Sequence, residues 1–88
     1  MNIKDKIMRL FGYENIDNIY IYDDFKNRPP KKVKMAERVL YYMENKKFKV
    51  PIIITKHWAY GNWYLKDGYT SYLIAKENNI KYVKVVRV

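Results

Sequence analysis

The segment from Trp63 to Ala75 constrains the fold more than any other part of the chain. It starts with apolar and aromatic residues typical of a strand, passes through Asp67 and Gly68, and continues with the spacing of a helix. A strand that enters a helix through a glycine turn leaves backbone N–H groups without partners at the helix start. These donors and the positive end of the helix dipole favour an anion. The sequence therefore predicts a strand, a tight turn, a helix and a phosphate site at the start of that helix.

Two apolar stretches on either side of this segment complete a strand–helix–strand pattern. Residues Val50 to Thr55 form a short continuous apolar run, which is typical of a strand covered on both faces. Residues Lys81 to Val88 alternate between polar and apolar and predict a final strand. A right-handed crossover through the helix would make these strands parallel. We expect Ile52 to Ile54 to be central, with Trp63 to Lys66 returning antiparallel to it as a hairpin.

The first half of the chain is predicted to add two helices, a strand and a loop. The helices cover Asn2 to Phe11 and Val33 to Lys47, the strand lies within Ile16 to Tyr22, and Asp23 to Lys34 is a polar loop. Asn2 is the expected cap of the first helix, which ends before Gly12. Each helix carries an apolar stripe that we expect to pack into the core. The stripes consist of Ile3, Ile7, Leu10 and Phe11 in the first helix, and of Val33, Ala36, Val39, Leu40 and Met43 in the second.

The order α-β-α-β-β-α-β predicts a single α+β domain over residues 1–88, a small mixed sheet with helices packed against it. Its 18 Lys and Arg against nine Asp and Glu give a formal net charge of +9. That charge suggests a polyanionic partner: nucleic acid, a nucleotide or an acidic protein surface. The alternative is a basic composition without such a partner. The chain has no cysteine and one histidine, so we expect neither a disulfide nor a thiolate or His-rich metal site.

The N-terminus lacks the apolar run of a signal peptide, and the longest apolar run is far too short for a membrane span. We therefore expect a cytoplasmic protein without a membrane partner.

Three runs of sequence carry a resemblance to a known family. They are Val-Pro-Ile-Ile-Ile from Val50, Trp-Tyr-Leu-Lys-Asp-Gly-Tyr-Thr-Ser-Tyr-Leu-Ile-Ala from Trp63, and Ile-Lys-Tyr-Val-Lys-Val from Ile80. In this order they resemble the ParB N-terminal domain and sulfiredoxin superfamily, over roughly Ile16 to Val88. The Arg-Pro-Pro run from Arg28 is weakly similar to a loop that precedes a helix in that family.

The resemblance implies a compact α/β domain in which phosphates sit near the glycine turn and the helix start. Members include chromosome-segregation proteins that bind CTP, sulfiredoxins that bind ATP, and nucleases. Gly68 matches the motif glycine, Tyr72 the aromatic residue that follows its arginine, and Ala75 a small helix residue. The polar pair and arginine of the motif are replaced by Tyr69, Thr70 and Ser71. Sulfinic-acid reduction is excluded because the catalytic cysteine is absent, and nucleotide hydrolysis is disfavoured by the missing arginine.

Two groups of residues are the candidate binding sites. The first is the helix start, where backbone amides and the hydroxyls of Thr70 and Ser71 would hold a phosphate; its residues are Gly68, Tyr69, Thr70 and Ser71. The second is the basic loop, which would contact a phosphate backbone or would only be solvated; its residues are Lys26, Arg28, Lys31, Lys32 and Lys34. No catalytic residue and no metal ligand is assigned, since the adjacent carboxylates Asp23 and Asp24 point apart on a strand end.

The aromatic residues near the hairpin tip, His57 to Tyr60 and Trp63-Tyr64, allow two interpretations. They pack the edge of a small core, which we favour, or they form a stacking or partner surface.

We predict a binding module for nucleic acid or a nucleotide, with a degenerate ParB-like phosphate motif, from a plasmid or phage. A nucleotide would be its only cofactor. One alternative is a nucleotide hydrolase or nuclease of the same superfamily. The other is a protein-interaction or inhibitor module that uses exposed aromatic residues.

Overall fold

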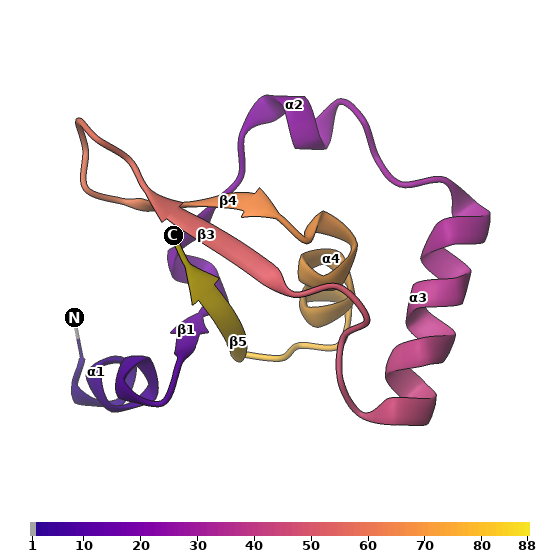
Figure 1. Cartoon of the computed structure of the whole chain (residues 1–88), viewed down its shortest axis with the longest axis horizontal. Helices are drawn as coiled ribbons and strands as arrows, with labels where there is room; N and C mark the ends of the chain where they lie inside the picture. Colours follow the sequence, from indigo (N-terminus) through magenta and orange to yellow (C-terminus); the bar gives the residue numbers. More distant parts are fainter. Residues whose placement is uncertain (1) are drawn as a thin grey trace.

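The computed structural model describes residues 2–88, which form a five-stranded mixed sheet with helices around it (Figure 1). The elements run in the order α1 (Ile3–Leu10), β1 (Tyr13–Asn15), a 3-10 turn (Ile16–Asn18), β2 (Ile19–Tyr20), α2 (Asp23–Lys26), α3 (Lys32–Asn45), β3 (Ile52–Lys56), β4 (Trp63–Asp67), α4 (Tyr69–Glu77) and β5 (Tyr82–Arg87). Within this part of the chain, no helix is both long and apolar enough to cross a membrane.

The strand order β1-β5-β3-β4-β2 places β3 at the centre of the sheet. β3 pairs parallel with β5, with Ile52 opposite Val85, and antiparallel with β4. At the edges, β1 is antiparallel to β5 and β2 is parallel to β4. The predicted α+β class, the central strand and the parallel crossover through α4 are therefore confirmed.

The hydrophobic core lies where α4 packs against one face of the sheet. Tyr72, Ile74 and Ala75 of α4 are buried, and strand residues complete the cluster. Fully burying an apolar side chain of this size stabilises the fold by about 1.5–3 kcal/mol, so this cluster supplies much of the stability. The other buried core residues are Ile16, Ile19, Ile52, Ile54, Leu65, Val83 and Val85.

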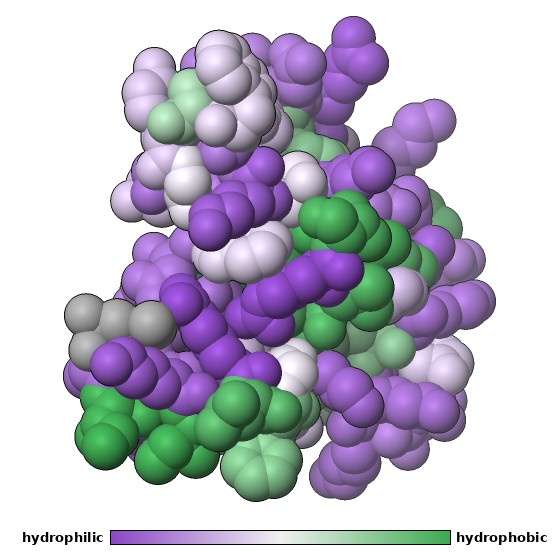
Figure 2. All heavy atoms as spheres, turned by 60° about the vertical axis from the view of Figure 1, so that its left-hand side comes forward, coloured by the Kyte–Doolittle hydropathy of each residue, from purple (hydrophilic) through white to green (hydrophobic). Residues whose placement is uncertain are grey.

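Helix α1 has the predicted ends but not the predicted orientation. The side chain of Asn2 accepts a hydrogen bond from the Asp5 backbone N–H at 2.8 Å, and Gly12 has φ +84°. Its apolar stripe is exposed, with Leu10 at 84% of its full accessible area, so the expectation that this stripe enters the core is wrong. In Figure 2, hydrophobic spheres gather at the lower edge of the molecule, where Figure 1 places α1.

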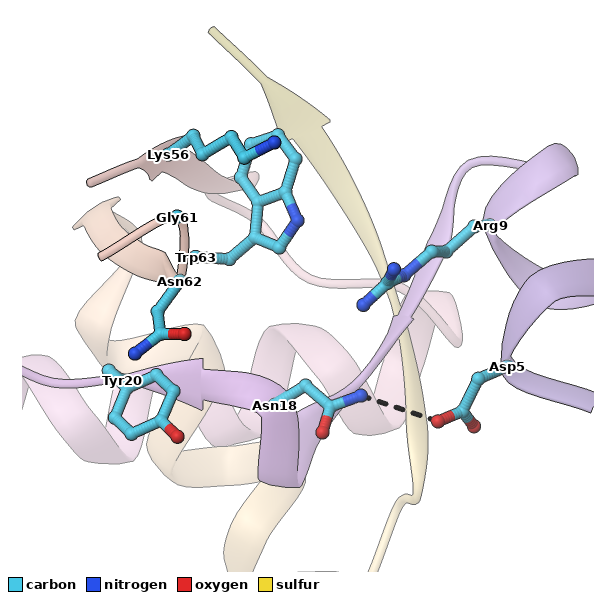
Figure 3. Close-up of a pocket in the computed structure, with 8 residues that line it drawn as sticks. All are labelled: Asp5, Arg9, Asn18, Tyr20, Lys56, Gly61, Asn62 and Trp63. Atoms are coloured by element: carbon cyan, nitrogen blue, oxygen red, sulfur yellow. Dashed lines mark hydrogen bonds between the residues drawn. The ribbon is translucent and has the colours of Figure 1, made fainter. Parts of the chain in front are cut away.

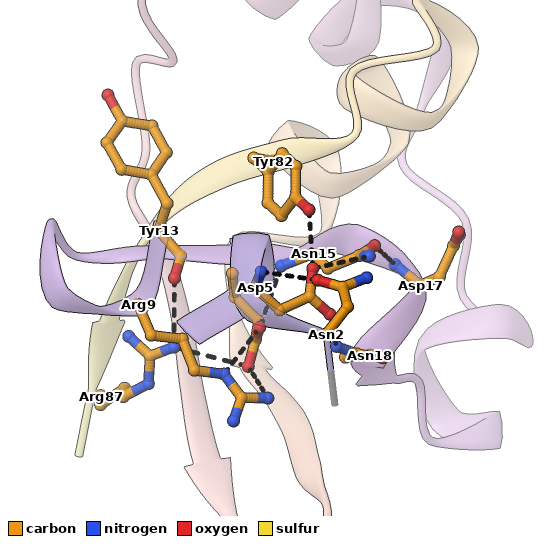
Figure 4. Close-up of polar contacts among 10 residues, drawn as sticks. Asn2, Asp5, Arg9, Tyr13, Asn15, Asp17, Asn18, Tyr82 and Arg87 are labelled. Carbon is orange, nitrogen blue, oxygen red and sulfur yellow. Dashed lines mark hydrogen bonds and ion pairs between the residues drawn. The ribbon is translucent and has the colours of Figure 1, made fainter. Parts of the chain in front are cut away.

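The physical reason is a polar cluster that holds the other face of α1 (Figure 4). Glu14 of β1 is completely buried, and its carboxylate pairs with Arg9 of α1 at 2.7 Å and with Arg87 of β5 at 3.4 Å. Its Oε2 also accepts the Asn15 backbone N–H at 2.9 Å. A buried carboxylate needs such partners, since an unpaired one is costly.

The buried Asp5 forms the second half of this cluster. Its carboxylate accepts a hydrogen bond from the Tyr82 hydroxyl at 2.6 Å and longer ones from Asn15 and Asn18. The Tyr82 hydrogen bond is the largest effect holding the pKa of Asp5 below its ordinary value, and the same bond raises the pKa of Tyr82 to about 12. α1 therefore turns its polar face inward.

Helix α3 forms in the predicted part of the sequence, but it stands away from the sheet (Figure 1). None of its fourteen residues, all within the described part of the chain, is buried. Leu40 is 55% exposed, so the expectation of a core position for this residue is wrong. Extended connections on both sides carry the helix outward, and the Tyr42 ring stacks on Phe48 just beyond its end, at 5.0 Å between centroids.

The predicted strand within Ile16 to Tyr22 is shorter than expected. Its first three residues form a 3-10 turn because the Asn15 side chain accepts the Asp17 backbone N–H at 3.0 Å. Only Ile19 and Tyr20 pair as β2. In the predicted polar loop, the short helix α2 occupies the first four residues.

Candidate phosphate-binding pocket

The turn between β4 and α4 forms as the sequence predicts. β4 ends at Asp67, Gly68 has φ +91°, and α4 begins at Tyr69. The Asp67 side chain accepts the Gly68 backbone N–H at 2.8 Å, which holds the turn. A Cβ atom on Gly68 would lie 2.3 Å from the Pro51 carbonyl oxygen, so only glycine permits this approach.

The start of α4 offers backbone donors. Gly68 is the cap residue, and as a glycine it has no side chain that could make a capping hydrogen bond. The first amides of an α-helix have no partner inside the helix. The side chains contribute less than predicted: Ser71 is buried, and its hydroxyl donates to the Val50 carbonyl at 2.6 Å. Ser71 is also absent from the lining of the pocket at this helix start, so its predicted phosphate contact stays a prediction.

A pocket of about 400 Å³ opens at this helix start. It joins the two groups of candidate residues, because the connection between α2 and α3 lines it together with the start of α4. Three cationic side chains stand in its wall: Arg28 from that connection, and Lys34 and Arg38 from α3. The complete lining is Phe25, Arg28, Pro30, Lys34, Arg38, Val50, Asp67, Gly68, Tyr69 and Thr70.

The pocket also has an aromatic wall. The ring of Phe25 in α2 lies 5.3 Å from that of Tyr69, which stacks in turn at 6.2 Å from the buried Tyr72. Cations, helix amides and aromatic rings on one cavity suit an anion attached to a planar group. Asp67 is the carboxylate of the lining, and it accepts the Gly68 N–H.

The predicted nucleic-acid-binding residues divide into two sets. Arg28 and Lys34 line the pocket, whereas Lys26, Lys31 and Lys32 are exposed outside its lining. Lys32 instead borders an apolar groove along α3. The three residues outside the pocket remain predictions.

Arg38 lines the pocket and was not identified from the sequence. It lies four residues after Lys34, and residues at this spacing share one face of a helix. That spacing was the feature of the sequence from which Arg38 could have been assigned to the same site as Lys34.

A second hollow, of about 420 Å³, lies between α1 and the hairpin (Figure 3). Two of the three charged side chains in its lining are already engaged: Arg9 pairs with Glu14, and Asp5 accepts a hydrogen bond from Asn18 at 3.3 Å. Elsewhere in residues 2–88, no group of three or more His, Cys, Asp or Glu side chains is placed to hold a metal ion. The pocket at the start of α4 is therefore the better candidate site.

Comparison with solved structures matches a ParB-N domain described as Pnob8-like. The two have 25% sequence identity and a TM-score of 0.66 over 85% of this chain. The chain has a ParB-N-like fold. It spans only 28% of the length of that matched chain. Neither a protein-family model nor a curated protein sequence matches it.

Within the ParB-N-like fold, the residues that matched the family motif have different positions. Gly68 lies at the pocket, whereas Tyr72 and Ala75 are buried in the core. Tyr69 and Thr70, which stand in the place of the motif's polar residues, line the pocket. The resemblance thus marks the location of the pocket, and the cations come from outside the motif.

Proposed function

We propose that this chain is a binding module that recognises a phosphate of a nucleotide or nucleic acid in the pocket at the start of α4. The observation that carries this proposal is the convergence of three cationic side chains, Arg28, Lys34 and Arg38, on one uncapped helix start. Cations and helix amides bind phosphate through complementary charge and directed hydrogen bonds.

The two arginines compensate for the arginine that the motif lacks. A guanidinium offers a planar fork of donors that matches two phosphate oxygens, which an ammonium does not. Arg28 and Arg38 come from separate elements, so a phosphate between them would be held from two sides. The Phe25 and Tyr69 rings would then lie beside the group attached to the phosphate.

We infer binding without hydrolysis. The Ser71 hydroxyl already donates to Val50, Thr70 is only 7% exposed, and the Asp67 carboxylate accepts the Gly68 N–H. A general base must reach the proton that it removes, and a nucleophile needs such a base. Asp67 is the one carboxylate in the pocket lining, and among the described residues it makes no hydrogen bond to the Thr70 or Ser71 hydroxyl.

The test is a titration with CTP, ATP, single-stranded DNA and duplex DNA at two salt concentrations. The pocket variant Arg28→Ala/Arg38→Ala should lose affinity for at least one nucleotide by about tenfold or more, since a charge-assisted hydrogen bond contributes about 1.5–3 kcal/mol. The variant Lys31→Ala/Lys32→Ala is the matched control, because it removes the same charge from outside the pocket.

Equal nucleotide binding by both variants and the wild type would reject the pocket. Phosphate release from CTP or ATP by pure protein, lost in Thr70→Ala, would favour the enzyme alternative instead.

A further inference from the structure

Six aromatic rings form a continuous cluster along the hairpin and the neighbouring strand β2. Tyr64 of β4 is its centre, with Tyr22 at 4.4 Å, Tyr20 at 5.4 Å and His57 at 5.4 Å between ring centroids. His57 in turn stacks with Tyr60 at 4.7 Å and with Trp58 at 6.0 Å. We call these six residues the aromatic ladder.

The ladder is a surface feature and not part of the core. Trp58 is 92% exposed and Tyr60 is 73% exposed, so the interpretation that these two residues pack the core edge is wrong. Tyr64 lies on the face of β4 opposite to the core residue Leu65. Figure 2 shows residues of intermediate hydropathy at the top of the view, where Figure 1 places the hairpin. Large exposed apolar rings in one patch indicate a binding surface.

The hairpin tip is held in a defined shape. The His57 ring nitrogen Nδ1 accepts the backbone N–H groups of Ala59 and Tyr60 at 3.1 and 3.2 Å. The His57 backbone N–H donates to the Asn62 backbone carbonyl at 2.7 Å, and the Gly61 backbone N–H donates to the His57 backbone carbonyl at 2.9 Å. A tip fixed in this way presents its rings with little entropy left to lose on binding.

The charges around the ladder favour an anionic partner over a cationic or neutral one. The two segments that carry the rings, residues 19–22 and 52–66, contain Lys56 and Lys66 but no aspartate or glutamate. The whole chain has a net charge of +9. Asp23, Asp24 and Asp67 follow directly at the ends of these segments, away from the hairpin tip. Rings beside lysines match the way in which single strands are bound, with bases stacked on aromatic faces and cations near the backbone.

The ladder also leads to the phosphate pocket. Asp67 lies three residues beyond Tyr64, about 10 Å along strand β4. In the chain that continues from β2 into α2, Phe25 of the pocket follows Tyr22 of the ladder by three residues. The near end of the ladder is therefore within reach of the nucleotides next to a phosphate in the pocket.

We propose that the aromatic ladder is a stacking surface for the unpaired bases of single-stranded nucleic acid. This inference rests on the proposed function and names the substrate class of the same site: a single strand, with a phosphate in the pocket and bases on the ladder. Duplex bases are already stacked on one another, so the ladder distinguishes single strands from duplexes.

The experiment measures binding of labelled oligothymidylate, oligouridylate and a duplex, each of about 15 nucleotides, a length typical of single-strand sites. The ladder variant is Trp58→Ala/Tyr60→Ala, which should fold because both rings are exposed. Its affinity for one or both single strands should fall by about fivefold or more per ring, with duplex affinity unchanged. Comparing oligothymidylate with oligouridylate shows whether the protein prefers DNA or RNA.

Two controls isolate stacking. Trp58→Phe/Tyr60→Phe keeps aromatic faces and should retain most of the affinity. Ile3→Ala/Leu10→Ala removes equally exposed apolar side chains from α1 and should change nothing.

If the ladder variant binds single strands as tightly as the wild type, the ladder proposal is wrong. It is also wrong if the variant loses the same affinity for the duplex as for the single strands. In either case, a loss of nucleotide affinity in Arg28→Ala/Arg38→Ala would still support the phosphate pocket. Failure of the wild type to bind any oligonucleotide overturns the ladder proposal, and failure to bind nucleotides as well overturns both.

Discussion

At the scale of single residues, Gly68 brings the start of α4 against the backbone of the central strand. A Cβ atom at this position would meet the Pro51 carbonyl oxygen at 2.3 Å and the Ile52 Cα at 2.9 Å. Both neighbours are backbone atoms, so neither can rotate away. The pocket therefore depends on this glycine for its shape as well as for its turn.

We expect Gly68→Ala to lower the free energy of unfolding by at least about 2 kcal/mol, from left-handed strain and from overpacking. Chemical denaturation would measure it. Gly12→Ala is the matched control: Gly12 has a similar φ of +84° but open space around its Cβ position. That variant should lose only about 1 kcal/mol. Equal losses in the two variants would contradict the close approach.

The Tyr82–Asp5 hydrogen bond should make stability depend on alkaline pH. The folded protein raises the pKa of Tyr82 from 10.0 to about 12, so this contribution is complete below pH 10.0 and is lost as the pH rises through about 12. We expect the free energy of unfolding to fall over this window less in Tyr82→Phe than in the wild type. All other residues are the same in both proteins, so the difference between the two curves isolates the hydrogen bond. Parallel curves would contradict it.

The buried carboxylates of Asp5 and Glu14 could not be predicted from the sequence. Each has a partner more than seventy residues away along the chain: Tyr82 for Asp5 and Arg87 for Glu14. An isolated acidic residue near an N-terminus carries no local sign of burial. Only the pairing of β1 with β5 brings these groups together.

At the scale of elements, helix α3 shows what a periodic apolar pattern does and does not establish. The spacing of its apolar residues correctly predicted a helix, because residues at this spacing fall on one face of a helix. It could not say what covers that face, because the connections before and after α3 carry it away from the sheet. The same limit applies to α1, whose inward face is polar.

Two leucines give the direct test of these placements. Leu40→Ala should change the free energy of unfolding by less than about 1 kcal/mol, as expected for an exposed position. Leu65→Ala, in the core under α4, should cost about 2–5 kcal/mol. Denaturation midpoints of the two variants provide the comparison. A large loss in Leu40→Ala would mean that α3 packs against another surface.

The short elements were the least predictable. β1 has three residues, β2 two and α2 four, which is too few for a period to emerge. By contrast, β3 and the α4 crossover were predicted correctly because the apolar run, the glycine turn and the handedness rule all agree.

At the scale of the whole molecule, the net charge of +9 gives an expectation for how binding to a long polyanion would depend on salt. If the partner is nucleic acid, each neutralised phosphate releases counterions and steepens the dependence on salt. Replacing Lys31 and Lys32 by alanine should weaken binding to all sequences alike and flatten the salt slope by about one to two units. Titrations at several salt concentrations measure this slope. An unchanged slope would remove these lysines from the interface.

The candidate pocket was predicted only in part, because it is assembled from distant segments. The glycine turn located the helix start, and the basic loop supplied Arg28 and Lys34. Arg38 was missed because a basic residue in a helix is usually solvated, and the position of α3 relative to α4 was not known. The sequence contains the components of the pocket, and the fold determines which of them meet.

The exposed position of α3 has a consequence for hydrogen exchange. A helix without buried residues can open without unfolding the core, so its amides should exchange far faster than those of β3 and α4. Lys34 and Arg38 of the pocket lie on this helix. A bound phosphate would link it to the start of α4, and α3 would then gain protection as the site fills. A helix without buried residues would thus report directly on occupancy.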